Sequence, residues 1–419
     1  MKILHISHSD TIGGAARAAY RLHKAQLASG FDSEMMVRVK KTDDWTVLGP
    51  SSKKSKAFSL IRPTIGQQLN KLQRSENSNF HSGNWLPSNW SSRINRCDAD
   101  VVHLHWVAGE TMSIYDIGRI KKPIVWTLHD MWPFCGMEHV TSHDLSARWR
   151  QPYTAANRGL YDKGIDLDRF TWTRKKKYWK QKMNIVAPSE WMADCVRGSE
   201  LFSENVTTVI PNTLNTDVYK PLDRSFCRQV LRLPLDKKII LFGAMGGGKD
   251  FNKGYDLLLD SLNKLVVDIE KDNVICVIFG QSQPQNLTSL PYTSIWLGHV
   301  FDDVTLSILY NSADVMVVPS RIESFGQTAS EAQACGIPVV AFNSTGLKDV
   351  IEHSRTGYLA SHFDTSDLAK GIQFYISPQC LKIDRDYIRK RAIKLWSYKT
   401  VSEKYADLYS YVLNNLTVC

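Results

Sequence analysis

The chain has 419 residues, of which 43% are hydrophobic and 22% charged, and this composition excludes a disordered protein. The net charge of +10 comes from one part of the sequence: residues 1–200 hold 30 Lys and Arg against 19 Asp and Glu, or +11, and the remainder carries −1. This asymmetry argues against a uniformly basic protein and predicts that one half faces an anionic partner.

Two other classes of protein are not expected. No run reaches the roughly 18 apolar residues of a transmembrane helix, and the start MKILHISHSD lacks the apolar core of a signal peptide. The eight cysteines contain no Cys-x-x-Cys pair, which favours reduced thiols over a disulfide framework or a zinc site. We therefore expect a cytoplasmic protein of two or three domains.

The first half of the chain predicts βα units of a parallel sheet. Residues 2–7 (KILHIS) are expected to form a buried strand, followed by a turn at Gly13-Gly14 and a helix that ends at Gly30. Three further short apolar runs are typical of buried strands: 101–106, 123–129 and 184–189. The polar residues 41–95 predict surface loops with one helix around 57–73.

The second half repeats this alternation of strands and helices. The predicted strands are 237–244, 273–280, 294–300, 314–320 and 338–342. A final helical segment is expected over 389–415. Two sets of parallel strands in succession predict two doubly wound α/β domains, 1–205 and 206–395, that face a central cleft and bind ligands at the carboxyl ends of their strands.

The most specific pattern lies in residues 320–342 (SRIESFGQTASEAQACGIPVVAF). Glu323 is expected on a loop after a buried strand, and Glu331 in the helix that follows. The start of that helix offers backbone N–H groups and a positive helix end, which suit a phosphate, and the two carboxylates suit the hydroxyl groups of a sugar or ribose. The spacing alone does not distinguish this binding role from a bland alternative. In that alternative Glu323 is solvated and Glu331 is an ordinary helix residue.

This segment resembles the nucleotide-sugar signature of the family 4 retaining glycosyltransferases, which have the GT-B fold of two Rossmann-like domains. The matching residues are Glu323, Phe325-Gly326, Glu331 and the run Gly336 to Val340. The resemblance spans almost the whole chain in the family's order, through Gly13-Gly14, His129 in TLHD, 186–192, 209–221 and 241–259. It is closest to enzymes of bacterial surface polysaccharides, including colanic acid, capsule and O-antigen, and it implies that a C-terminal helix, about 396–419, completes the first domain.

The resemblance implies a donor site in the second domain. Lys253 would hold the donor diphosphate as a compact point charge, close to the strand-end Gly243. Glu331 would bind the ribose hydroxyls. Glu323 would contact the donor sugar together with the backbone amides of three residues, Phe325, Gly326 and Gln327.

The resemblance also implies roles for residues of the first domain. Gly13 and Gly14 would let backbone amides approach the phosphates without a Cβ in the way. His129 would contact the sugar near its reacting carbon. The alternatives are a plain tight turn for the glycine pair and a strand-end histidine satisfied by the backbone for His129.

The reaction implied is a transfer with retention of configuration, in which fixed donors stabilise the negative charge that develops on the leaving diphosphate. We find no Asp-x-Asp flanked by strand residues, so no metal and no cofactor is expected beyond the nucleotide-diphosphate sugar, a UDP- or GDP-linked co-substrate. Glu323 would act as an electrostatic and positioning group rather than as a covalent nucleophile.

Two departures from the family pattern bear on details of the site. The family's arginine after the strand glycine is absent, because the residues here are Gly243-Ala244-Met245; Lys249 is the first candidate to replace it and Arg321 the second. The cysteine-rich insert of many relatives is reduced to Cys135, so a metal or disulfide is not expected there.

A basic run at 174–182 (RKKKYWKQK) combines six cations with aromatic residues and no acid, which suits an anionic membrane surface but also fits a solvated helix face. The residues expected on the membrane and acceptor side are Arg174, Lys175, Lys176, Lys177, Trp179, Lys180 and Lys182. The expected partners are an oligosaccharide linked to polyprenyl diphosphate and anionic lipid of the inner leaflet, which would place the protein peripherally on the cytoplasmic face.

Two other function classes fit parts of this sequence. A GT-B relative that is not a transferase, of the epimerase or phosphorylase type, would share the donor signature. A nucleic-acid-binding protein would use the basic half, but no recognised binding motif accompanies the basic run and the donor signature would be left without a role. We therefore expect no nucleic-acid partner.

Overall fold

The computed structural model describes residues 1–243, 246, 250–283, 290–377 and 383–415. The chain forms two compact units: unit 1 comprises Met1–Pro211 and Val401–Cys419, and unit 2 comprises Asn212–Thr400. Both are parallel β-sheets covered by helices, which confirms the predicted α/β fold class.

Unit 1 contains a seven-stranded parallel sheet in the order β3-β2-β1-β5-β6-β8-β9. Its strands are β1 (Lys2–Ser9), β2 (Asp32–Val39), β3 (Val47–Leu48), β5 (Val101–Leu104), β6 (Ile124–Thr127), β8 (Asn184–Ala187) and β9 (Thr207–Val209). Its helices are α1 (Gly14–Ala28), α2 (Lys53–Asn70), α3 (Trp90–Arg96), α4 (Ile114–Ile117), η1 (Arg148–Arg150), α5 (Leu167–Tyr178), α6 (Glu190–Arg197) and most of α14 (Tyr398–Asn414). A short antiparallel ribbon pairs β4 (Gln73–Arg74) with β7 (Lys163–Gly164).

Unit 2 contains a six-stranded parallel sheet in the order β12-β11-β10-β13-β14-β15. Its strands are β10 (Lys238–Gly243), β11 (Val274–Phe279), β12 (Thr293–Trp296), β13 (Val315–Val318), β14 (Val339–Phe342) and β15 (Gly357–Ala360). Its helices are α7 (Arg224–Val230), η2 (Phe251–Lys253), α8 (Tyr255–Leu265), η3 (Lys271–Asn273), α9 (Asp303–Ser312), α10 (Gln327–Ala334), α11 (Leu347–Val350), α12 (Thr365–Ile376) and α13 (Arg385–Trp396).

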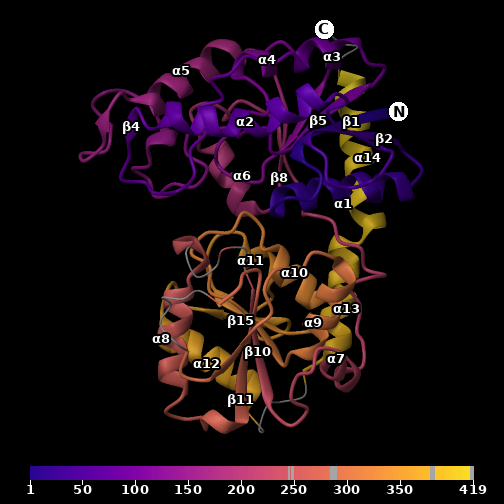
Figure 1. Ribbon diagram of the computed structural model, residues 1–419, viewed down its shortest axis with the longest axis vertical. Coiled ribbons are helices and arrows are strands. Elements are labelled where there is room, and N and C mark those ends of the chain that lie inside the picture. The colour runs from indigo at the N-terminus through magenta and orange to yellow at the C-terminus, as the bar shows by residue number, and fades with distance from the viewer. Residues whose placement is uncertain (244–245, 247–249, 284–289, 378–382, 416–419) are drawn as a thin grey trace. The chain divides into compact units, whose positions relative to one another are not determined.

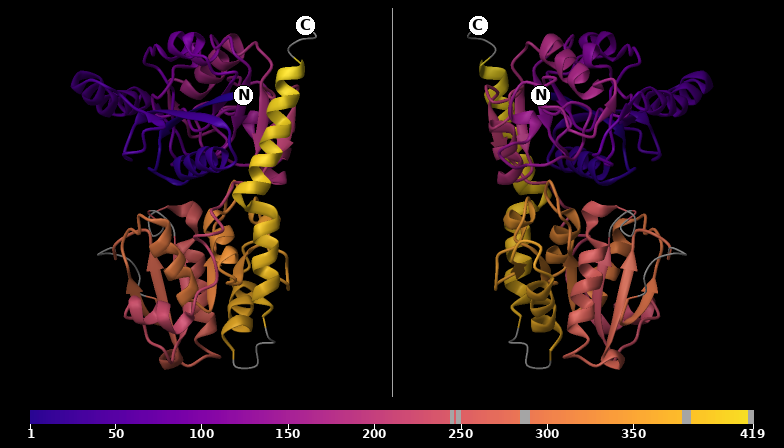
Figure 2. Two further views of the ribbon diagram at one scale, coloured as in Figure 1. Left: turned by 90° about the vertical axis from the view of Figure 1, so that its right-hand side faces the viewer. Right: turned by 90° about the vertical axis from the view of Figure 1, so that its left-hand side faces the viewer.

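The central strands of the unit 2 sheet, β10, β11, β13 and β14, are buried on both faces, which explains why they are apolar runs. In β10, Ile239 and Leu241 belong to one hydrophobic cluster, and Ile240 and Phe242 belong to the cluster on the opposite face. Figure 1 shows the helices on the two sides of this sheet. In unit 1 one of the covering helices is α14, seen in yellow along one side of the unit in Figure 2.

Two predicted helices differ from the observed ones. The helix expected around 57–73 begins earlier, at Lys53, because Ser52 caps it and forms a capping box with Ser55. The single segment expected over 389–415 is two helices, because Ser397 adopts an extended conformation and its hydroxyl accepts a hydrogen bond from the backbone of Thr400. No helix within the described residues is long and apolar enough to cross a membrane.

Candidate functional site

Three loops meet at the carboxyl edge of the sheet in unit 2. They follow β10, β13 and β14, which are neighbours in the sheet, so parallel pairing brings their ends together. Gly254 lies where two of these loops approach each other: its φ is +67° and an added Cβ would lie 2.0 Å from the carbonyl oxygen of Pro319. A side chain at this position would therefore push the loops apart.

Lys253 and Glu323 form an ion pair at this edge. The Lys253 ammonium donates to Oε1 of Glu323 at 2.7 Å, and the Ser320 hydroxyl donates to the same oxygen at 2.9 Å. Burial disfavours the charge on Lys253, but the negative charge of Glu323 and its hydrogen bond outweigh this effect and raise the pKa of Lys253. The lysine therefore carries a full positive charge at neutral pH, with its side chain 27% exposed.

Arg321 is held beside this pair but is already engaged. Its guanidinium donates two hydrogen bonds to Asp256, at 2.9 and 2.6 Å, and stacks on the Phe251 ring. These contacts weaken its candidacy as the replacement for the missing arginine. Lys249, the first candidate, lies outside the described residues, as do Ala244 and Met245.

The predicted donor-site segment opens α10. Gly326 is the N-cap of this helix with φ of 100°, no side chain caps it, and Phe325 is buried against Trp396. Glu331 lies within α10 and is buried, and its Oε2 accepts a hydrogen bond from the Tyr310 hydroxyl at 2.7 Å. The tyrosine contact was not foreseen, because it joins α9 to α10 and has no signature in the local sequence.

Gly243 ends β10, and an added Cβ there would lie 2.0 Å from the Phe279 ring. This contact gives Gly243 a packing role in addition to the donor-binding role that the sequence predicts. The glycine is required because the neighbouring strand β11 places an aromatic ring against the backbone at this point.

Unit 1 presents its own predicted residues at the carboxyl edge of its sheet. Gly13 is the N-cap of α1 with φ of 88°, and Gly14 is the first residue of that helix. His129 follows β6 and is partly exposed, and burial of its ring lowers its pKa to about 4. Its Nε2 lies 3.2 Å from Nδ1 of His105, so His129 is held by another side chain and not by backbone alone.

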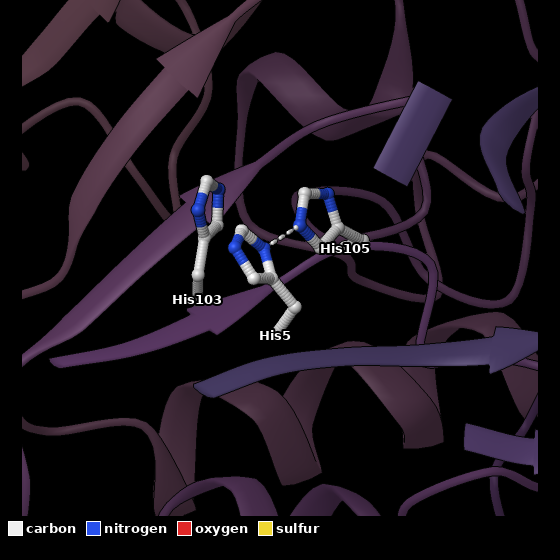
Figure 3. A group of neighbouring side chains, drawn as sticks. All are labelled: His5, His103 and His105. Carbon is white, nitrogen blue, oxygen red and sulfur yellow. Dashed lines mark hydrogen bonds between the residues drawn. The ribbon is translucent and has the colours of Figure 1, made fainter. Parts of the chain in front are cut away.

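His129 is the outermost member of a group of histidines that the sequence analysis did not single out. His5, His103 and His105 are buried, and one ring nitrogen of each lies within 4.8 Å of those of the other two, a spacing that a metal ion could bridge (Figure 3). The available signal was the alternation in VVHLHW, which predicts His103 in β5 and His105 just after it on the same side of the chain, and the register that pairs His5 with His103.

The prediction that 174–182 faces a membrane is contradicted for Lys175, and two further residues of the run, Arg174 and Trp179, make contacts within the unit. Lys175 is buried, and its ammonium donates to the carbonyl oxygens of Trp132, Cys135 and Gly136. Arg174 donates to two backbone carbonyls and stacks on an indole ring, and the Trp179 indole donates to the backbone and packs on the core. The exposed cations of the run are Lys176, Lys177, Lys180 and Lys182.

The physical reason is that α5 presents Lys175 to the interior. The loop that follows β6 turns three carbonyl groups inward there, and an ammonium group with three N–H donors satisfies them. The Trp132 ring lies 3.9 Å from the ammonium, and burial lowers the pKa of Lys175 to about 7. A basic run in the sequence does not distinguish such a structural cation from solvated ones.

Unit 1 also contains a polar cavity of about 220 Å³ beside the carboxyl end of β2. Arg38 and Arg93 line it together with four serines at the start of α2: Ser51, Ser52, Ser55 and Ser59. Its lining includes no acidic residue among those that the structure describes. Such a surface favours an anion with several oxygen atoms.

Comparison with protein-family models gives two matches that together run along most of the chain. Residues 12–218 match the model described as Glycosyltransferase Family 4. Residues 223–395 match the model described as Glycosyl transferases group 1. The first match includes Gly13-Gly14 and His129, and the second includes Lys253, Glu323 and Glu331.

Among curated proteins, the chain is similar to D-inositol 3-phosphate glycosyltransferases. It is 32% identical over 153 residues to that of Pseudarthrobacter chlorophenolicus, covering 36% of this chain and 30% of the relative. It is 27% identical over 332 residues to that of Saccharomonospora viridis, and the match covers 74% of this chain and 69% of the relative. The match thus spans less than a third of the first relative's length and about two thirds of the second's.

Solved structures resemble the chain along its whole length. Sucrose-phosphate synthase from Thermosynechococcus elongatus matches with a TM-score of 0.65 and 17% identity, covering 99% of this chain and all of that one. HepE of Anabaena in complex with UDP and glucose matches with a TM-score of 0.60 and 16% identity, covering 98% and 99%. WaaG, a glycosyltransferase involved in lipopolysaccharide biosynthesis, matches with a TM-score of 0.59 and 14% identity, covering 97% and 99%. At these identities the likeness concerns the fold.

Proposed function

Because the chain belongs to the family 4 glycosyltransferases of the GT-B fold, we propose that it transfers a sugar from a nucleoside diphosphate sugar to an acceptor hydroxyl, with retention of configuration. The observation that carries this proposal is the Lys253–Glu323 pair, set at the carboxyl edge of the unit 2 sheet beside the start of α10. It combines a cation for a phosphate with a carboxylate for sugar hydroxyls.

The proposed chemistry follows from the charge that develops on the leaving group. Breaking the bond between sugar and diphosphate builds negative charge on the diphosphate and positive charge on the sugar ring. A donor diphosphate would compete with Glu323 for the Lys253 ammonium, which would bring that cation onto the leaving group. Glu323 and the backbone amides at the start of α10 would then hold the sugar, and the role proposed for His129 is contact near the reacting carbon.

Glu331 is proposed to bind the ribose of the donor, and this assignment gives the test of the function. We expect UDP or GDP, but not DNA, to raise the melting temperature of the protein. Titration calorimetry should show nucleotide binding weakened about 10- to 100-fold in Glu331→Ala, the loss that corresponds to hydrogen bonds with a charged group. Glu323→Ala should lower turnover more than nucleotide affinity.

Glu270→Ala is the matched control, because Glu270 is an exposed glutamate of the same unit. Nucleotide affinity should be unchanged in this variant. Unimpaired binding by Glu331→Ala would overturn the role assigned to that residue. Stabilisation by DNA alone would overturn the proposed function.

The acceptor we propose is a growing oligosaccharide on a lipid diphosphate, in the synthesis of a surface polysaccharide. A second candidate is a polyol phosphate, since the relatives named above are D-inositol 3-phosphate glycosyltransferases. The cavity that contains Arg38 and Arg93 favours a phosphate-bearing acceptor of either kind, because two guanidinium groups line it. Turnover measured on a panel of both acceptor classes would distinguish them.

We further propose that unit 1 contacts anionic lipid of the inner leaflet through α2, and not mainly through 174–182. The face of this helix that is buried against the unit is narrow and polar. On that face the buried Arg62 donates hydrogen bonds to three backbone carbonyls. Its exposed apolar side chains are Phe58, Leu60, Ile61, Ile65 and Leu69. Three exposed lysines lie in its first turn, Lys53, Lys54 and Lys56, and the helix contains no acid.

This arrangement reverses that of an ordinary surface helix, which buries its apolar residues against the core. Apolar side chains beside lysines complement the acyl and headgroup layers of an anionic bilayer. Removing two of the apolar side chains should therefore weaken vesicle binding. We expect Leu60→Gln/Ile61→Gln to bind vesicles that contain phosphatidylglycerol about ten-fold or more weakly in co-sedimentation.

Val267→Gln is the control, because Val267 is an even more exposed apolar residue of unit 2, and it should bind as the wild type does. A variant with Lys176, Lys177, Lys180 and Lys182 replaced by glutamine should lose less binding than the α2 variant. Wild-type binding by the α2 variant, or loss of binding only in the lysine variant, would contradict the assignment.

A further inference from the structure

A continuous series of hydrogen bonds connects His129 to the C-terminal helix. His129 Nε2 lies 3.2 Å from His105 Nδ1, and His105 Nε2 lies 2.9 Å from His5 Nδ1. His5 Nε2 lies 2.8 Å from the Gln26 side-chain oxygen, and the Gln26 amide nitrogen donates to the Tyr409 hydroxyl at 2.9 Å. The series therefore begins at His129 in the loop after β6 and passes the end of β5 and then β1. It ends at α14, which it reaches through α1.

All six ring nitrogens of the three buried histidines are used in such contacts. Besides those just described, Nδ1 of His103 lies 2.6 Å from the Tyr409 hydroxyl, and its Nε2 lies 2.7 Å from Thr127 Oγ1. Figure 3 shows the rings of His5 and His105 joined edge to edge, with His103 beside them. This arrangement favours a hydrogen-bonded network over a bound metal ion, which would have to displace several of these bonds.

The rings in the series are neutral. Burial lowers the pKa of His5 to about 3 and that of His129 to about 4, and it holds the pKa of His105 well below its ordinary value. A neutral imidazole carries one proton, so one nitrogen donates and the other accepts. The orientation of one member therefore fixes the tautomer of every other member.

Gln26 provides that orientation. Its amide nitrogen faces Tyr409 and its oxygen faces His5, so the proton of His5 must lie on Nε2. His5 Nδ1 then accepts from His105 Nε2, and His105 Nδ1 accepts from His129 Nε2. The Tyr409 hydroxyl oxygen can accept the hydrogen bond from the Gln26 amide because the hydroxyl donates its own proton in a hydrogen bond to Nδ1 of His103.

We propose that Tyr409, Gln26, His5 and His105 are positioning residues that fix His129 as its Nε2–H tautomer. His129 then keeps a lone pair on Nδ1, with which it can accept a hydrogen bond from a hydroxyl group of the reacting sugars. This inference rests on the proposed function for its consequence in catalysis, but the tautomer is a property of the protein by itself. The C-terminal helix thereby contributes to the site through four hydrogen bonds.

The test is ¹⁵N NMR of the full chain labelled at histidine. We expect the wild type to show His129 protonated at Nε2 and unprotonated at Nδ1. Tyr409→Phe keeps the ring but removes the hydroxyl that orients Gln26, so His129 should become a mixture of tautomers. Turnover should fall about fivefold, the effect of one hydrogen bond, while KM for the donor stays within about twofold.

Tyr411→Phe is the matched control, because Tyr411 is an exposed tyrosine of the same helix, and it should change neither reading. His105→Asn keeps an acceptor near the position of Nδ1 and should retain more turnover than His105→Leu. An Nδ1–H tautomer at His129, or one equivalent of bound zinc in the purified protein, would overturn the proposal. Absence of turnover in the wild type would contradict only the proposed function, since the spectra would still report the tautomer.

Discussion

Lys253→Met is expected to lower turnover by about 10²- to 10³-fold, the effect of removing one preorganised donor to a developing negative charge. The ammonium is positioned for this role by Glu323, which it contacts at 2.7 Å, and by the closed turn at Gly254. Steady-state kinetics with the nucleotide sugar would measure the loss. Nucleotide affinity should fall less than turnover, because the charge on the diphosphate grows in the transition state.

Two variants separate this role from a purely structural one. Lys264→Met removes another lysine of unit 2, which pairs with an aspartate on the exposed face of α8, and should retain full turnover. Adding Glu323→Gln to Lys253→Met removes the carboxylate that the first substitution leaves without its cation. If Lys253 served only to neutralise Glu323, the double variant would recover stability and show the same turnover as Glu323→Gln alone, and that equality would contradict the catalytic role of Lys253.

Unit 1 is expected to lose stability steeply between pH 6.5 and pH 4. Burial lowers the pKa of six of its histidines, to about 3 for His5, to about 4 for His8, His23 and His129, and well below the ordinary value for His103 and His105. These rings stay neutral in the folded unit but take up protons in the unfolded chain below pH 6.5. The stability that they contribute is therefore present above pH 6.5 and is lost as the pH falls.

The magnitude follows from the number of protons. Each histidine protonated only in the unfolded chain lowers the free energy of unfolding by about 1.4 kcal/mol per pH unit. Two glutamates of the unit act in the opposite direction: burial raises the pKa of Glu138 to about 8 and also raises that of Glu110, so the folded unit holds protons there that the unfolded chain releases above about pH 4.5. The six histidines outnumber them, and the net effect is destabilisation by acid.

Urea unfolding at pH 7.5, 6.5 and 5.5 would measure this dependence. His23→Gln should reduce the slope of the free energy of unfolding against pH by about the contribution of one proton. His23 is one of the six histidines and lies outside the series that leads to His129. His362→Gln, at an exposed residue of unit 2, should leave it unchanged. Equal stability at pH 7.5 and pH 5.5 would contradict the prediction.

The sequence by itself determined the fold class and the residues that make up the donor motif. Short apolar runs alternating with amphipathic helices are sufficient for parallel sheets, because strands covered on both faces have to be apolar along their length. β2 (Asp32–Val39) was missed, since its polar residues at Ser33, Glu34 and Arg38 interrupt the apolar run. The roles that the motif predicts for Glu323, Glu331 and Lys253 remain proposals that the kinetics and calorimetry above would test.

Only the tertiary structure decided which charged and polar side chains face water. The sequence predicts Lys175 as one of six cations on an exposed run, but the structure buries it. The reason is that three inward carbonyl groups of a loop distant in sequence accept hydrogen bonds from its ammonium group. His5 and His103 read as strand residues, yet the register of β1 and β5 places them side by side beneath His129. Local sequence fixes the period of an element, whereas the partner of a buried polar group comes from another part of the chain and is decided by how the elements pack.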